Sequence, residues 1–171
     1  MQSVLLKLRN VEPEDIDVLM EIENNEDNFR LSETLYPYSR YEIEQFVLNN
    51  SHDIFSNKQV RFMIEDKATG DVAGCVDLFD INPLHRRAGV GIIIKADYRN
   101  KGYAAETLEI IRDYAFGTLA LHQLYCNIQA GNTSSIGLFE KAGYKRQGVK
   151  KDWEFYDGKF TDVLFYQLIK K

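Results

Sequence analysis

Apolar positions along this chain repeat with two different periods. Alternating or short unbroken apolar runs predict β-strands, whereas apolar residues spaced three and four apart predict amphipathic helices. The predicted strands are Val4–Arg9, Val60–Glu65, Val72–Phe79, Ala88–Ile94, Leu124–Gln129, Tyr144–Val149 and Thr161–Ile169. The predicted helices are Glu12–Asn25, a helix that begins after Ser39, Tyr103–Phe116 and Asn132–Ala142. An alternation of about seven strands and about four helices is typical of an α/β domain with a mixed sheet.

Several boundaries carry their own local signals. Pro13 stands where the first turn of a helix tolerates proline, and Gly143 stands where helices often end. Ser39 followed by Glu42 predicts a capping box. Asp157-Gly158 predicts a tight turn between the last two strands.

The length of 171 residues fits one domain, residues 1–171, and 44% hydrophobic with 27% charged residues is a globular composition. The longest apolar run is far too short to span a membrane. Cys75 and Cys126 each lie in an apolar strand-like run, which favours buried thiols over a disulfide or a metal site. We therefore expect a cytoplasmic protein without a bound metal or membrane contact.

The charge is distributed unevenly. A net charge of −5 argues against a general nucleic-acid-binding protein. The first 60 residues hold twelve acidic and five basic residues, a net charge of −7, which leaves +2 for the remainder. The acidic part either attracts a cation or carries acids on solvated helix faces, and the sequence leaves both open.

The segment after Ala88–Ile94 has the character of an anion site. An apolar strand leads into a short loop that opens into a helix, and Gly102 allows close approach of the backbone. The first-turn N–H groups of that helix would attract an anion, and Arg99 and Lys101 add positive charge. Neither the Walker nor the dinucleotide-binding glycine pattern is present. The alternative is a simple strand–helix connection with a basic pair on the surface.

Two motifs together point to a family. Arg99-x-x-Gly102-x-Ala104 after an apolar strand, followed by Asn132 and then Leu138-Phe139-Glu140-Lys141-x-Gly143-Tyr144, resembles the coenzyme A signatures of the GCN5-related N-acetyltransferase (GNAT) superfamily. Asp77-Leu78-Phe79-Asp80-Ile81-Asn82 with His85-Arg86-Arg87-Ala88 resembles the spermidine N-acetyltransferases, and ribosomal-protein N-terminal acetyltransferases share the general layout. The resemblance implies a splayed central sheet and acetyl-CoA as cosubstrate.

The resemblance also implies a set of cofactor-binding residues. The pantetheine arm should pair like a strand with Ile92, Ile93 and Ile94. The pyrophosphate should meet the backbone of Arg99, Asn100, Lys101, Gly102, Tyr103 and Ala104. Asn132 should reach the arm with its amide, and Phe139 and Lys141 should flank the arm and the nucleotide.

The implied reaction is direct attack of a neutral primary amine on the thioester. Asp80 and Asp77, at the end of the preceding strand, are the candidate catalytic bases, and the alternative is that both are solvated strand-end acids. Many relatives carry a tyrosine at the position of Phe139 to protonate the leaving thiolate, which Phe cannot do. Gly89 stands where spermidine acetyltransferases tend to carry a glutamate.

The acceptor is the least constrained part of the hypothesis. Glu33, Glu42 and Tyr36 are the candidate substrate-binding residues, because spaced carboxylates and an aromatic ring suit a polyamine such as spermidine. A protein amino terminus, as in ribosomal-protein acetyltransferases, is the alternative acceptor. A non-catalytic acyl-CoA-binding regulatory module is a second alternative. The closing strands could also pair across a homo-oligomer.

Overall fold

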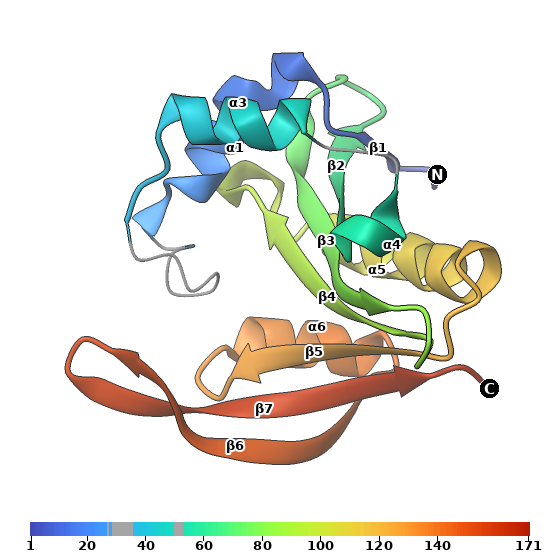
Figure 1. Ribbon diagram of the computed structural model, residues 1–171, viewed down its shortest axis with the longest axis vertical. Helices are drawn as coiled ribbons and strands as arrows, with labels where there is room; N and C mark the ends of the chain where they lie inside the picture. Colours follow the sequence, from blue (N-terminus) through green and yellow to red (C-terminus); the bar gives the residue numbers. More distant parts are fainter. Residues whose placement is uncertain (27, 29–35, 50–52) are drawn as a thin grey trace.

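A computed structural model of the chain describes residues 1–26, 28, 36–49 and 53–171. Its centre is a seven-stranded sheet with the order β1-β2-β3-β4-β5-β7-β6 (Figure 1). The strands are β1 Leu6–Asn10, β2 Val60–Asp66, β3 Val72–Asn82, β4 Arg87–Ile94, β5 Gln123–Gln129, β6 Lys145–Tyr156 and β7 Lys159–Ile169. Neighbouring strands are antiparallel except for β4 and β5, which are parallel. The expected mixed sheet of an α/β fold is confirmed.

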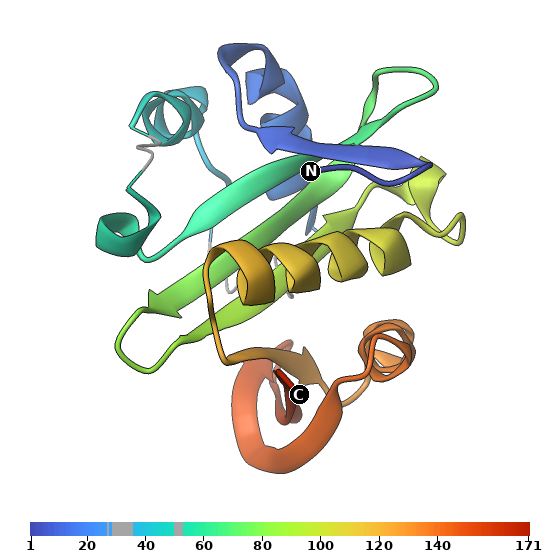
Figure 2. The same cartoon turned by 90° about the vertical axis from the view of Figure 1, so that its right-hand side faces the viewer.

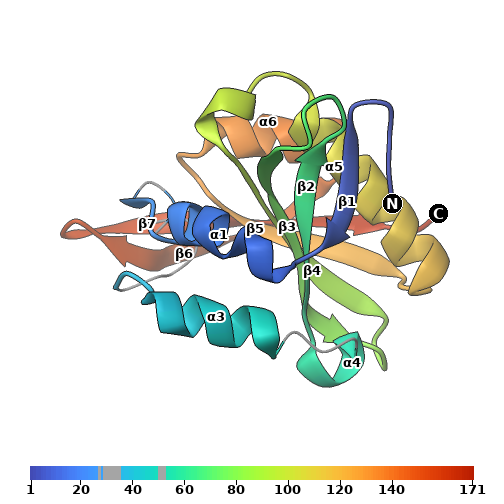
Figure 3. The same cartoon turned by 90° about the horizontal axis from the view of Figure 1, so that it is seen from above.

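Helices cover both faces of this sheet. They are α1 Ile16–Glu23, α3 Arg40–Leu48, α4 Ile54–Asn57, α5 Tyr103–Asp113 and α6 Thr133–Lys141. One buried cluster joins α1 and α3 to the sheet through Leu19, Ile22, Ile43, Val47 and Met63. The larger cluster lies under α5 and α6 on the opposite face. Figures 2 and 3 show the two helix layers on either side of the sheet. The face that carries α1 and α3 is called the front face below.

The strands β4 and β5 stay together over only three residue pairs. Arg87, Ala88 and Gly89 are paired with Gln123, Leu124 and Tyr125. Beyond Gly89 the two strands diverge, as Figure 1 shows. We call the point of divergence at Gly89 and Tyr125 the fork. The splayed sheet that the resemblance implied is therefore present.

The structure corrects some predicted boundaries. β6 continues to Tyr156 instead of ending at Val149, because it is an edge strand that can carry exposed polar residues. β3 continues to Asn82, so Asp80 lies inside the strand instead of beyond its end. The four-residue helix α4 was not predicted, because a single turn has no apolar period. The predicted capping box of Ser39 and Glu42 is confirmed.

Two further sequence predictions concern burial and turns. Cys75 and Cys126 are free and buried, and burial raises the pKa of each thiol to about 12. The turn at Asp157-Gly158 has positive φ at both residues, as a two-residue hairpin between right-twisted strands requires. Among the described residues, no helix is both long and apolar enough to cross a membrane.

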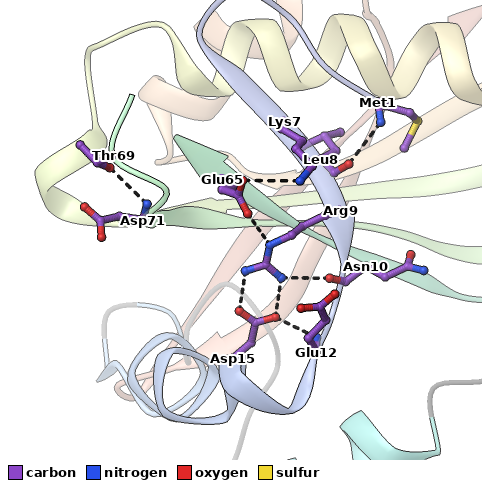
Figure 4. Close-up of polar contacts among 10 residues, drawn as sticks. All are labelled: Met1, Lys7, Leu8, Arg9, Asn10, Glu12, Asp15, Glu65, Thr69 and Asp71. Carbon is purple, nitrogen blue, oxygen red and sulfur yellow. Dashed lines mark hydrogen bonds and ion pairs between the residues drawn. The ribbon is translucent and has the colours of Figure 1, made fainter. Parts of the chain in front are cut away.

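An ion-pair network fixes the start of α1 to the edge of the sheet (Figure 4). Arg9 on β1 donates two hydrogen bonds to Asp15, at 2.7 and 2.8 Å, and one to Glu65 on β2 at 2.6 Å. Asp15 is only 3% exposed and also accepts from the backbone N–H of Glu12. Burial alone would raise the pKa of Asp15, but the bonds from Arg9 and Glu12 outweigh it, and the pKa is lowered.

Arg9→Met should destabilise the protein by about 3 kcal/mol, because it leaves the Asp15 carboxylate buried without its partner. A carboxylate whose pKa is lowered on folding stabilises the protein above its unfolded pKa and loses that contribution as the pH falls. The deficit of the variant should therefore shrink below pH ~4. Urea unfolding at several pH values measures it.

Arg40→Met is the matched control. Arg40 pairs with Asp17 and Glu44 on the surface, where its side chain is 57% exposed. Its replacement should change stability little. Equal destabilisation by both substitutions would contradict the assigned role of the Arg9 network.

Candidate active site

The fork leaves one edge of β4 without a strand partner. Ile92, Ile93 and Ile94 pair with β3 on one side, and β5 has already diverged on the other. All three isoleucines are half-buried. Backbone N–H and C=O groups along such an edge require hydrogen-bond partners, and an extended chain with amides can supply them. The geometry therefore fits the predicted strand-like pairing of a pantetheine arm.

The loop after β4 has the backbone that the anion site requires. Gly102 has a φ of +92° and Asn100 a φ of +60°, so the chain turns sharply before α5. No side chain caps the start of α5, which leaves first-turn N–H groups of an 11-residue helix available to an anion. Arg99 and Lys101 are exposed beside this turn, and Arg99 Nε donates to the carbonyl of Ile94 at 3.0 Å.

Tyr103 fixes the end of this loop to the sheet. Its ring is buried, and its hydroxyl donates to Asp66 on β2 at 2.7 Å. Burial and this bond raise the pKa of Tyr103 to about 12, so the hydroxyl stays protonated. Tyr98 packs edge-on against the Tyr103 ring at 5.3 Å, and the Lys101 ammonium lies over the Tyr98 ring. The side chain of Tyr103 thus has a structural role, and only its backbone N–H can serve the anion.

The second motif is placed at the start and on one side of α6. The Oδ1 atom of Asn132 accepts from the N–H of Ser135 at 3.0 Å and caps the helix. Phe139 is only 4% exposed, and its ring packs edge-on against Tyr144 with centroids 5.0 Å apart. Lys141 is exposed near the end of α6. The predicted contacts of these three residues with the cofactor stay predictions.

The two candidate bases have different surroundings. Asp77 on β3 receives hydrogen bonds from Arg61 Nε and Nη2, at 2.9 and 2.8 Å to its two carboxylate oxygens. Arg61 is also ion-paired with Glu23 of α1, and its guanidinium lies over the Phe46 ring. The carboxylate of Asp77 is therefore occupied by a half-buried cation.

Asp80 is exposed and lies next to the fork. Its φ of +48° marks the irregularity where β3 loses register with β4. Its Oδ2 atom accepts from the hydroxyl of Tyr125 at 3.1 Å. Burial, together with the charge of Asp80, raises the pKa of Tyr125 to about 12. Since no cation pairs with Asp80 in the described part of the chain, Asp80 is the better placed of the two candidate bases.

The predicted substrate-binding residues are scattered around the front face. Tyr36 is 62% exposed. Glu42 accepts hydrogen bonds from the N–H and hydroxyl of Ser39, which lower its pKa and tie it to the start of α3. Glu33 lies outside the described residues. The sequence alone did not predict Arg61, Glu23 and Tyr125 as site residues. Arg61 carried a signal, because it is a charged residue between the apolar Val60 and Phe62.

Comparison with known proteins decides the family. The family profile described as an acetyltransferase (GNAT) domain matches residues 6–145. The chain belongs to the GNAT acetyltransferase family. The resemblance carried by the two motifs around Gly102 and Phe139 is thereby confirmed.

Named relatives of this GNAT acetyltransferase act on spermidine. The spermidine N(1)-acetyltransferase of Vibrio cholerae is 31% identical over 161 residues, which cover 92% of this chain and 89% of that protein. The Escherichia coli K12 enzyme of the same name is 32% identical, with coverage of 93% and 83%. A crystal structure of the Vibrio cholerae enzyme with CoA and spermine matches with a TM-score of 0.87 at 30% identity, covering 96% and 95% of the two chains. This GNAT acetyltransferase is therefore an N-acetyltransferase that uses acetyl-CoA.

Gly102→Ala should weaken coenzyme A binding about tenfold, because alanine disfavours the positive φ that orients the first turn of α5. Isothermal titration with coenzyme A measures the dissociation constant. Gly158→Ala is the control, since Gly158 has a φ of +73° in the distant β6–β7 turn. It should carry a similar backbone cost without changing the affinity. Equal affinities for both variants would contradict the assignment of the α5 N-terminus.

Proposed function

We propose that this GNAT acetyltransferase transfers the acetyl group of acetyl-CoA to a primary amine of a polyamine such as spermidine. The observation that carries the proposal is similarity over nearly the whole chain to spermidine N-acetyltransferases, one of them crystallised with spermine. The acidic side chains of the front face support it, because Asp80, Glu23 and Asp77 lie there, and Arg61 is the cation that pairs with Glu23 and Asp77. Tyr36 and Glu42 are further candidates for contacts with distant ammonium groups.

Acetyl-CoA supplies the thioester, whose carbonyl carbon forms a bond to the amine nitrogen while its bond to sulfur breaks. The open edge of β4 at Ile92–Ile94 would align the arm, and the first turn of α5 would hold the pyrophosphate. This alignment would bring the reacting carbon near the fork. Correct placement of the two reactants accounts for much of the rate enhancement in such a transfer.

The proposed base is Asp80. An aliphatic ammonium has a pKa of about 10, so an amine bound at pH 7 must lose a proton before it attacks. Asp80 would take that proton directly or through a water molecule. Phe139 cannot donate a proton to the departing thiolate, and its buried ring has no hydroxyl to offer. The thiolate would therefore leave without help from this residue and take its proton from solvent.

The proposal also covers the location of the enzyme and the partners that it does not bind. We infer a cytoplasmic enzyme that binds no nucleic acid, which agrees with the free thiols and the acidic net charge. Two rival functions differ in their acceptors: a protein amino terminus, or no acceptor at all in a non-catalytic acyl-CoA-binding module.

Release of coenzyme A, followed with a thiol reagent, should rise above background hydrolysis with spermidine and spermine. Aminoglycosides and basic peptides should give much less. The protein's own buried thiols, Cys75 and Cys126, should contribute little signal in the folded state. Turnover with peptides alone would replace the polyamine by a protein acceptor. Binding of acetyl-CoA without any turnover would favour the regulatory module.

Asp80→Asn should lower kcat about 100-fold, since the amide cannot accept the ammonium proton. The substitution also alters the bond from Tyr125, so Tyr125→Phe is the control. It removes the same hydrogen bond but keeps the carboxylate, and kcat should stay within about threefold of wild type. Steady-state kinetics at saturating acetyl-CoA measures both. If the two variants lost activity equally, the hydroxyl of Tyr125 rather than the carboxylate would be the essential group.

A further inference from the structure

Three aromatic side chains gather on the front face at the fork. Phe79 on β3 packs edge-on against Tyr125 on β5, with ring centroids 5.9 Å apart. Tyr125 in turn contacts Phe165 on β7 at 5.9 Å. All three rings are half-buried, and neither core cluster of the described residues includes any of them. We call these three residues the aromatic wall. It spans the fork from β3 to β7 without being needed to fill either core.

The two β4 residues next to the Phe79 ring, Gly89 and Gly91, have no side chains. A methyl group on Gly89 would overlap three carbon atoms of the Phe79 ring, and one on Gly91 would lie 3.8 Å from it. Gly89 does not have positive φ, so the backbone at this position does not itself require glycine. The ring of Phe79 requires it. Phe79 and Gly89 therefore form one steric unit at the point where β4 and β5 diverge.

The wall has a negatively charged border. Asp80 follows Phe79 in the chain and accepts the hydroxyl hydrogen of Tyr125. Asp77 lies opposite Gly91 in the β3–β4 ladder, but its carboxylate is paired with Arg61, so among the described residues Asp80 carries the unpaired charge of this border. Aromatic faces attract ammonium groups and also contact methylene groups well. Removal of water around a nitrogen also favours its neutral, reactive form. An aliphatic primary amine on an unbranched chain has the chemistry that this surface would recognise.

We propose that the aromatic wall, shaped by the Phe79–Gly89 unit, is the surface on which the reacting end of the acceptor amine lies, and that it sets the specificity for that end. The inference rests on the proposed function for the position of the acceptor at the fork. It adds residues that recognise the reacting aminomethylene end, which the acidic residues alone do not explain. Because every primary alkyl amine has such an end, the wall acts alike on spermidine and on n-butylamine.

The test is a double-mutant cycle on Phe79 and Gly89, with n-butylamine and spermidine as acceptors. Phe79→Ala should raise the acceptor KM about tenfold for both amines, with kcat changed less and the KM for acetyl-CoA unchanged. Gly89→Ala should raise the acceptor KM as well, because its methyl group displaces the ring. The double variant should be no worse than Phe79→Ala alone, since the ring that Gly89 accommodates is gone.

Two measurements keep the result interpretable. Thermal unfolding and the dissociation constant of coenzyme A should stay close to wild type in all three variants. Phe160→Ala is the matched control, because Phe160 is 62% exposed at the start of β7 near the β6–β7 turn, and its removal should leave the acceptor KM unchanged.

The outcomes separate the two proposals. The wall is refuted if Phe79→Ala leaves the acceptor KM within about twofold, or if the effects of the two substitutions simply multiply. Acetylation of n-butylamine but not of spermidine by the wild-type protein would contradict the polyamine proposal. The double-mutant cycle with n-butylamine would then still test the role of the aromatic wall. Acetylation of neither amine would overturn both.

Discussion

The early divergence of β4 and β5 is the constraint on which the rest of the site depends. Only three residue pairs join the strands, ending at Gly89 and Tyr125. A closed sheet would have satisfied the backbone of Ile92–Ile94 with its own neighbour. The fork instead leaves that edge for a ligand with amide groups, and it directs β4 into the loop that starts α5. Sheet, loop and helix together would thus form the one elongated binding site proposed for acetyl-CoA.

The two faces of the sheet serve different parts of this site. Under α5 and α6 lies the larger core, which buries Phe139 and Tyr103 and holds the loop between β4 and α5 in place. The front face carries the charged cluster of Arg61, Glu23 and Asp77. Breaking that cluster would leave a half-buried charge unpaired, so the cluster holds α1 against the sheet on the proposed acceptor side. Glu23 is the one member of this cluster that lies among the acidic first 60 residues.

The sequence predicted most of what depends on local chemistry. The strand–loop–helix around Gly102, the capping box of Ser39 and Glu42, and the turn at Asp157-Gly158 are each determined by neighbouring residues. The family followed from two motifs for the same reason. The polar edge strand β6 escaped prediction beyond Val149, because exposure on an edge removes the apolar period.

Contacts between distant segments could not be predicted in this way. The pairing of Arg61 with Asp77 depends on the β2–β3 register, and that with Glu23 depends on how α1 docks. In the sequence, Gly89 stands where spermidine acetyltransferases tend to carry a glutamate. The structure shows that the Phe79 ring fills the space that a side chain at this position would need. The hydrogen bond between Tyr125 and Asp80 likewise requires the irregularity in β3. Each of these features belongs to the proposed acceptor side, which is why the sequence alone predicted little about how an acceptor would bind.

The most direct test of the account is amide hydrogen exchange with and without acetyl-CoA. The central claim is that the cosubstrate completes the open edge of β4 and occupies the start of α5. Exchange should therefore slow at Ile92–Ile94 and at Tyr103–Ala105, and should stay unchanged in the β1–β2 pair. Protection confined to other segments, with the β4 edge exchanging as fast as in the free protein, would contradict the account.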